Sequence, residues 1–123
     1  MPISEGEFDP RDLSQFDVVV VPFPYSDRLA EKRRPAVVVS NRHLIQQGLI
    51  WVIMVTSSDN PRWPDDVDIE SLALSGLAHS SMIRPTKIAC IDPVRIIRIA
   101  GTLGSRERRR VLRSLKKFLD PEK

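Results

Sequence analysis

The chain has 123 residues, of which 41% are apolar and 28% are charged, proportions typical of one folded globular domain and unlike those of a disordered segment. Its single cysteine, Cys90, excludes an internal disulfide, and no apolar run is long enough for a membrane span. The N-terminal segment is acidic and lacks the apolar core of a signal peptide. We therefore expect a cytoplasmic protein without a membrane partner.

The net charge of +3 is unevenly distributed along the chain. Residues 105–119 carry seven basic side chains and one acidic one, whereas residues 59–70 carry five acidic side chains and one basic one. A second basic cluster consists of Arg28, Lys32, Arg33 and Arg34. This asymmetry fits a polyanionic partner, an acidic protein partner, or solvated faces that keep a small protein soluble.

Seven short segments are predicted as strands, because they are rich in β-branched or large apolar residues or alternate between polar and apolar ones. They are residues 16–23, 36–40, 49–56, 66–70, 81–84, 87–91 and 94–99. Pro85 and Pro93 interrupt the last three, because proline inside a sheet forces an edge, a bulge or a turn. The pattern predicts a small, curled antiparallel sheet or barrel.

One clear helix is predicted at the C-terminal end. Ser105 is a good N-cap residue, and Pro121 ends the helix. We expect an apolar stripe to pack on the sheet while the basic side chains face water. The stripe consists of Val111, Leu112, Leu115, Phe118 and Leu119. Residues 41–47 and 70–75 are compatible with shorter helical turns, so the expected fold class is α+β, mostly β.

The sequence contains no glycine-rich phosphate-binding motif, and its histidines and cysteine lack the spacing of metal ligands. We therefore expect neither a metal nor a cofactor. His43 and His79 are interpreted as ordinary surface or loop residues. Cys90 lies in the apolar run KIACID and is interpreted as a small buried side chain rather than a nucleophile.

Arginine and hydroxyl side chains stand at the ends of the predicted strands. Arg34 begins the second strand, and the segment VTSS, which contains Thr56, Ser57 and Ser58, ends the third. Arg84 ends a later strand, with Thr86 and Lys87 close behind it. Such side chains on a rigid sheet are suited to binding and polarising a phosphate.

Several segments of the sequence, taken in order, resemble a known family. The segment DVVVVPFPYSDRLAEKRRPAVVVS resembles the opening of the MazF/PemK/Kid toxins, with a strand, a polar loop and a second strand beginning in RRPA. The resemblance continues through VTSS, through GLAHSSMIRPTKIACID and into the C-terminal helix. It covers residues 16–119, so we expect one toxin domain over residues 16–123 and an unassigned N-terminal extension over residues 1–15.

The resemblance implies a fold, an activity and partners. The fold is a small SH3-like antiparallel barrel, shared with CcdB, with a C-terminal amphipathic helix. Members are homodimeric toxins of type II toxin–antitoxin systems that cleave single-stranded RNA without a metal. The cognate antitoxin binds the RNA groove through a largely disordered, often acidic tail.

The resemblance also assigns site residues. Arg34 and Thr56 match the family's active-site arginine and threonine, and Arg84 matches a catalytic arginine of Kid-like members. We expect RNA to be bound by Tyr25, Asp27, Arg28, Lys32, Arg33, Ser57, Ser58, Thr86 and Lys87. Trp63 is a second candidate, beside Tyr25, for stacking on a base, whereas Trp51 is expected in the core. The basic C-terminal helix could bind RNA, hold the antitoxin, or be a solvated face.

The chemistry can be argued from the reaction itself. RNA is cleaved when a 2′-OH attacks the adjacent phosphorus, and a fixed guanidinium stabilises the dianionic phosphorane. We expect Arg84 to form that clamp, Arg34 to act in the clamp or on the 5′-oxygen, and Thr56 to orient the phosphate or the 2′-OH.

Three departures from the family pattern leave the general base unassigned. Thr86 stands where Kid-like members have an aspartate, Ser58 stands where a glutamine is often found, and residues 25–32 contain no histidine. A gyrase poison like CcdB, or a binding domain without catalysis, would share the fold. Each site residue also has a structural alternative: Arg34 could pair with Asp17 or Asp92, Thr56 could cap a turn, and Arg84 could be a surface residue.

Overall fold

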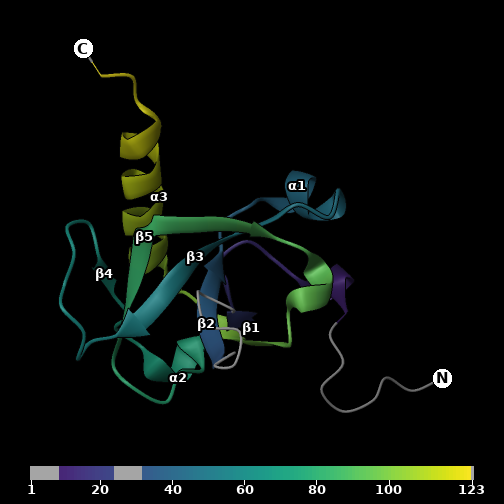
Figure 1. Cartoon of the computed structure of the whole chain (residues 1–123), viewed down its shortest axis with the longest axis horizontal. Helices are drawn as coiled ribbons and strands as arrows, with labels where there is room; N and C mark the ends of the chain where they lie inside the picture. Colours follow the sequence, from purple (N-terminus) through teal and green to yellow (C-terminus); the bar gives the residue numbers. More distant parts are fainter. Residues whose placement is uncertain (1–8, 24–31, 123) are drawn as a thin grey trace.

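The computed structural model describes residues 9–23 and 32–122. Its centre is one antiparallel sheet of six strands in the order β4-β5-β3-β2-β1-β6 (Figure 1). The strands are β1 (Asp17–Phe23), β2 (Lys32–Val38), β3 (Ile50–Ser57), β4 (Val67–Asp68), β5 (Ser81–Ile91) and β6 (Arg98–Thr102). The predicted α+β, mostly β fold, with a small antiparallel sheet and a C-terminal helix, is therefore confirmed.

Strand β5 is longer than predicted, because Pro85 bends it without ending it. Ser81–Arg84 pairs with one half of β3 and Ile88–Ile91 pairs with the other half, and the register shifts between Ile53 and Met54. The three residues from Pro85 to Lys87 fall in this bulge, where proline needs to donate no ladder hydrogen bond. The bend curls the sheet around its core.

Two other strand predictions were too long. Only Val67 and Asp68 of the predicted strand 66–70 pair with β5. The predicted strand 94–99 is replaced by a 3-10 turn η3 (Pro93–Arg95), capped by Asp92, and by the start of β6. Proline at the first position of η3 favours such a turn.

The sheet buries apolar side chains on both faces. One core contains Val37, Ile53 and Ile83 and is covered by α3 (Ser105–Leu119), chiefly through Val111 and Leu115. The other contains Ala36, Val38 and Val52 and is covered by η1 (Pro10–Asp12), α1 (Arg42–Gln46) and η3, through the side chains Leu13, Ile45 and Ile96. Leu13 is completely buried, so residues next to η1 pack against the sheet.

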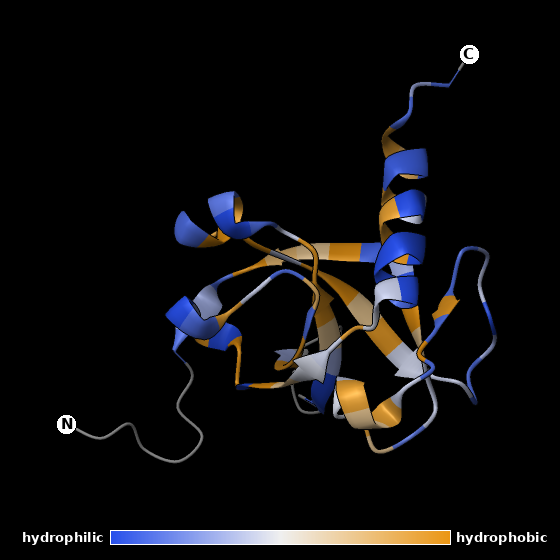
Figure 2. Cartoon of the chain, turned by 180° about the vertical axis from the view of Figure 1, so that it is seen from behind, coloured by the Kyte–Doolittle hydropathy of each residue, from blue (hydrophilic) through white to orange (hydrophobic). Residues whose placement is uncertain are grey.

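Helix α3 extends away from the sheet, and only its first part is covered (Figures 1 and 2). Val111 is buried, but Leu112, Phe118 and Leu119 are exposed by 46%, 39% and 83%. The expectation that the whole stripe packs on the sheet is therefore wrong for these three residues. The N-cap is Gly104, without a side-chain hydrogen bond, rather than Ser105.

On the face of the sheet that carries Ile53, the part of β3 and β5 around Trp51 and Cys90 is uncovered, which overturns two expectations. Trp51 and Cys90 are paired across these strands, and both are exposed. They lie on the same face as Ile53, but beyond the part that α3 covers. Trp51 is therefore not a core residue, and Cys90 is not a buried one.

Candidate functional site

An open pocket of about 880 Å³ lies where β2 begins and β3 ends. The loop between α2 (Leu72–Ser75) and β5 closes one side, and β6 contributes Arg98 and Ala100. Its polar and charged lining residues are Lys32, Arg33, Arg34, Thr56, Ser57, Asp59, Asn60, His79, Ser80, Ser81 and Arg98. Volume and lining are suited to a polar ligand of several atoms with negative charge.

Arg34 and Thr56 are brought together by the sheet. Ala36 pairs with Met54 in the antiparallel β2–β3 ladder. Continuing that register by two residues toward the strand ends places Arg34 opposite Thr56, and because side chains alternate, on the same face. Both residues line the pocket, which fits the sequence prediction that they act at one place.

The hydrogen bonds of these two side chains differ. The Oγ1 of Thr56 accepts a hydrogen bond of 2.6 Å from the Nδ2 of Asn60, which fixes the threonine side chain. The Nε of Arg34 is buried and has no hydrogen-bond partner among the described residues. A buried N–H without a partner costs about 1–3 kcal/mol, so this N–H is a donor that none of the described residues satisfies.

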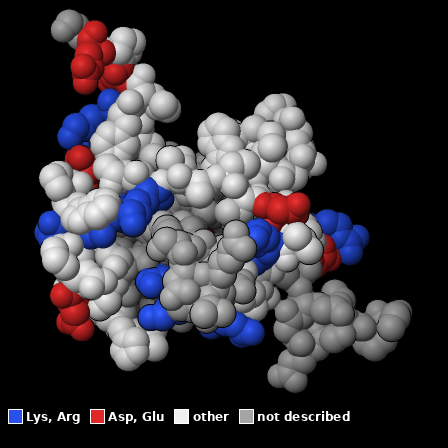
Figure 3. Space-filling model, in the orientation of Figure 1, with Lys and Arg blue, Asp and Glu red and all other residues white. Residues whose placement is uncertain are grey.

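The pocket is strongly basic. Lys32, Arg33, Arg34 and Arg98 carry positive charge, and Asp59 is the one carboxylate among the described lining residues. Figure 3 shows Lys and Arg side chains gathered in the lower central part of the molecule. Such a concave basic surface attracts a polyanion and raises its local concentration.

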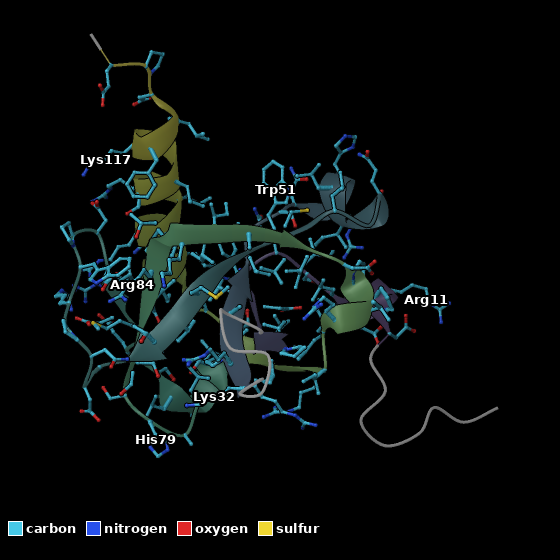
Figure 4. All side chains as sticks on the ribbon, viewed as in Figure 1. Arg11, Lys32, Trp51, His79, Arg84 and Lys117 are labelled. Carbon is cyan, nitrogen blue, oxygen red and sulfur yellow. The ribbon has the colours of Figure 1, made fainter. Side chains whose placement is uncertain are left out.

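Arg84 lies outside this pocket. Its Nη2 and Nε donate to the carboxylate of Asp66 at 2.8 and 3.1 Å, and Nη2 also donates to the carbonyl of Pro61 at 2.9 Å. The guanidinium lies 3.9 Å from the ring centroid of Trp63. The side chains of Arg84 and Asp66 are 8% and 0% exposed. Arg84 pairs with Met54 and so stands on the same face of the sheet as Thr56, but its guanidinium is bound to Asp66 and Pro61 and does not line the pocket. Figure 4 shows Arg84 apart from Lys32 and His79.

The remaining predicted RNA-binding residues are divided. Lys32, Arg33 and Ser57 line the pocket. Ser58 lies beside it and its hydroxyl accepts a hydrogen bond from Ser80. Thr86 and Lys87 are in the bulge of β5, and the Nζ of Lys87 lies 5.2 Å from the centroid of the Trp63 ring. Tyr25, Asp27 and Arg28 lie outside the described residues.

The sequence reasoning did not predict six of the polar and charged pocket residues, namely Asp59, Asn60, His79, Ser80, Ser81 and Arg98. Asn60 follows the VTSS segment by two positions, which is a signal that could have been used. His79 and Arg98 are distant in sequence from Arg34 and Thr56, and only the sheet order brings their segments to the same end of the molecule.

The acidic stretch of residues 59–70, which includes β4, is bound by basic residues. Lys117 pairs with Asp65 at 3.0 Å and Arg106 with Glu70 at 3.2 Å, so α3 neutralises part of this stretch. Within the stretch, Arg62 pairs with Asp68 at 2.8 Å, and that carboxylate raises the pKa of Arg62. Part of the basic face of α3 is therefore occupied by ion pairs within the chain and is not available to an RNA or protein partner.

Among residues 9–23 and 32–122, no group of three His, Cys, Asp or Glu side chains could hold a metal ion. The helices described in the structure are too short or too polar to cross a membrane.

A family comparison decides the class of the protein. The model of PemK-like, MazF-like toxins of type II toxin–antitoxin systems matches residues 14–119. The chain belongs to this toxin family. A comparison with curated protein sequences gave no match.

Solved structures with the same fold are distant in sequence. MazF from Deinococcus radiodurans superimposes with a TM-score of 0.68 at 21% identity, covering 87% of this chain and 96% of that one. A mycobacterial endoribonuclease in complex with its cognate antitoxin gives 0.71 at 12% identity, covering 89% and 99%. The toxin MazF-mt6 of Mycobacterium tuberculosis gives 0.68 at 14% identity, covering 87% and 99%.

Proposed function

We propose that this toxin is an endoribonuclease that cleaves single-stranded RNA without a metal ion. The observation that carries the proposal is that Arg34 and Thr56 line the same open basic pocket, and that the Nε of Arg34 has no hydrogen-bond partner among the described residues. Solved structures of the same fold include a mycobacterial endoribonuclease and a MazF toxin, which supports the same activity here.

The reaction is an attack by the 2′-OH of one nucleotide on its own 3′-phosphorus. The O2′–P bond forms and the P–O5′ bond breaks, leaving a 2′,3′-cyclic phosphate and a 5′-OH. Arg34 donates to the nonbridging oxygens as their negative charge grows, which is the charge that a metal would otherwise neutralise. Thr56, held by Asn60, orients the phosphate or the 2′-OH.

Arg84 takes a different role in this proposal from the clamp that the sequence predicted. Its guanidinium is already satisfied by Asp66 and Pro61 and covered by Trp63. It fixes the segment between β3 and β4, which carries Asn60, and so acts on the site as a positioning residue.

The activity test is cleavage of single-stranded RNA by purified protein in EDTA, with the ends of the products identified. Arg34→Ala should lose at least about 10²-fold in rate, the typical cost of one donor to a developing oxyanion. Arg42→Ala is the matched control, because Arg42 is an exposed arginine on α1. Cleavage that needs magnesium and leaves a 5′-phosphate contradicts the mechanism. Folded protein that inhibits gyrase without cleaving RNA favours a CcdB-like poison.

We also propose a homodimer formed through the uncovered face of β3 and β5. Trp51, Ile88 and Cys90 are exposed there, and Figure 3 shows a notch between α3 and α1 that is lined by uncharged atoms. The exposed Leu112 of α3 adds apolar surface that a second copy can cover. A two-fold contact buries such a face on both chains at once.

The antitoxin is proposed to bind the basic pocket with an acidic segment and so to block RNA. Lys32, Arg33 and Arg98 are exposed there, and carboxylates of a flexible tail can pair with them. Because such pairs are solvent-accessible, salt should weaken the complex.

A further inference from the structure

The pocket contains a histidine whose position is set by the surrounding chain. His79 lies in the loop between α2 and β5, lines the pocket and is exposed at its mouth. Figure 4 shows His79 and Lys32 at the same end of the molecule, with Trp51 at the other end.

Hydrogen bonds tie this loop to the strand that carries Thr56. The backbone N–H of Ser58 donates to the carbonyl of Ser80 at 3.0 Å, and the hydroxyl of Ser80 donates to that of Ser58 at 3.2 Å. The hydroxyl of Ser81 donates to the carbonyl of His79 at 2.8 Å. The residue that follows His79 is therefore held against Ser58 at the end of β3, and the carbonyl of His79 is fixed by Ser81.

Glycine fixes the other end of the loop. Gly76 has φ of +74° and lies so close to β6 that a Cβ would come within 2.0 Å of the carbonyl oxygen of Ala100. Only glycine fits a left-handed turn at this approach, so the loop leaves α2 in one direction and brings His79 to the pocket.

The reaction needs a proton acceptor, and few pocket residues can be one. The cationic side chains Lys32, Arg33, Arg34 and Arg98 are donors, and the hydroxyls hold their protons too tightly at neutral pH. Among the described lining residues, His79 and Asp59 are the acceptors. An imidazole is the better match, because the efficient general base is the one that titrates near the working pH.

We propose that His79 is the general base of the RNA cleavage, an inference that rests on the proposed endoribonuclease function. The neutral imidazole takes the proton of the 2′-OH while O2′ bonds to phosphorus. The P–O5′ bond breaks, and O5′ takes a proton from water that reaches the open pocket. Arg34 stabilises the phosphorane between these events, and the imidazolium returns its proton to solvent.

The test compares His79→Gln with the wild type on an RNA site that the wild type cleaves. The expected loss of kcat is about 10²–10⁴-fold, the usual contribution of a general acid or base. Binding of the same RNA with a 2′-deoxy nucleotide at the cleavage site should be unchanged. The matched control is His43→Gln, which removes the other histidine of the chain, on α1, and should cleave at the wild-type rate.

Two further measurements separate the base from other roles. Imidazole added to His79→Ala should restore cleavage. The cleavage rate of the wild type should fall at low pH, where the base is protonated, and this fall should be absent from the pH–rate profile of His79→Gln. An RNA with sulfur in place of O5′ has a leaving group that needs no proton, so His79→Gln should remain slow on it. Full recovery on that RNA would make His79 the general acid and overturn the proposal.

Failure of this inference is distinct from failure of the proposed function. If the wild type does not cleave RNA at all, the function is wrong. If the wild type cleaves and His79→Gln cleaves equally well while Asp59→Asn does not, the function stands and Asp59 is the base. Lost RNA binding with unchanged kcat in His79→Gln would make the residue a binding contact and also overturn the proposal.

Discussion

Breaking the buried ion pair of Arg84 and Asp66 should strongly destabilise the toxin. The two side chains are 8% and 0% exposed, and Asp66 also accepts the backbone N–H of Trp63 at 2.9 Å. Asp66→Asn keeps the size and an acceptor but removes the charge, which leaves the guanidinium buried without a counter-ion. The expected cost is about 3–5 kcal/mol, a large share of the roughly 5–15 kcal/mol that stabilises a domain.

Urea unfolding measures this cost. With a slope of about 2 kcal/mol per molar urea, the midpoint should fall by about 1.5–2.5 M. The matched control is Asp68→Asn, two positions along the chain, whose partner Arg62 forms an ion pair that is more than half exposed on both sides. That change should cost no more than about 1 kcal/mol. Equal costs for the two variants would refute the reasoning.

The double variant Asp66→Asn, Arg84→Met tests whether the pair acts as a unit. The double variant removes both charges, so its cost should be well below the sum of the two single costs. If Arg84 only positions the β3–β4 segment, the folded double variant should cleave RNA far faster than Arg34→Ala. A loss as large as that of Arg34→Ala would return Arg84 to the catalytic clamp.

Four further outcomes are expected. Thr56→Val should lower kcat for RNA cleavage by about tenfold or more, because an oriented hydrogen bond to the reacting group is lost, with little change in the unfolding midpoint. Trp51→Lys should shift the proposed dimer to monomer in sedimentation at micromolar concentration, whereas a stable wild-type monomer would contradict the interface. Burial raises the pKa of Asp17, so its contribution to folding stability is present at low pH and is lost as the pH rises through the pKa of the folded state. The thermal midpoint of the wild type should therefore decline above about pH 4, and that of Asp17→Asn should lack this decline. Antitoxin affinity, measured by calorimetry at several salt concentrations, should fall as the salt concentration rises. An affinity that does not change with salt would contradict binding at the basic pocket.

Much of the fold followed from the sequence alone. The β-branched runs in β1, β2 and β3 and the stripe of α3 carry their own periodicity, so strand and helix could be assigned locally. The pairing of Arg34 with Thr56 was predicted through the family resemblance, and it follows also from strand order, since both residues stand at the ends of neighbouring strands.

The tertiary structure decided the burial and partners of individual side chains. Trp51 and Arg84 lie in similar apolar strands, but Trp51 is exposed because α3 covers only part of its face, and Arg84 is buried because Asp66 and Trp63 enclose it. His79 reaches the pocket because Gly76 turns the loop against β6 and Ser80 binds it to β3. Local patterns record the period of a strand or helix, whereas such contacts depend on segments that are distant in the chain and meet only when the sheet has formed.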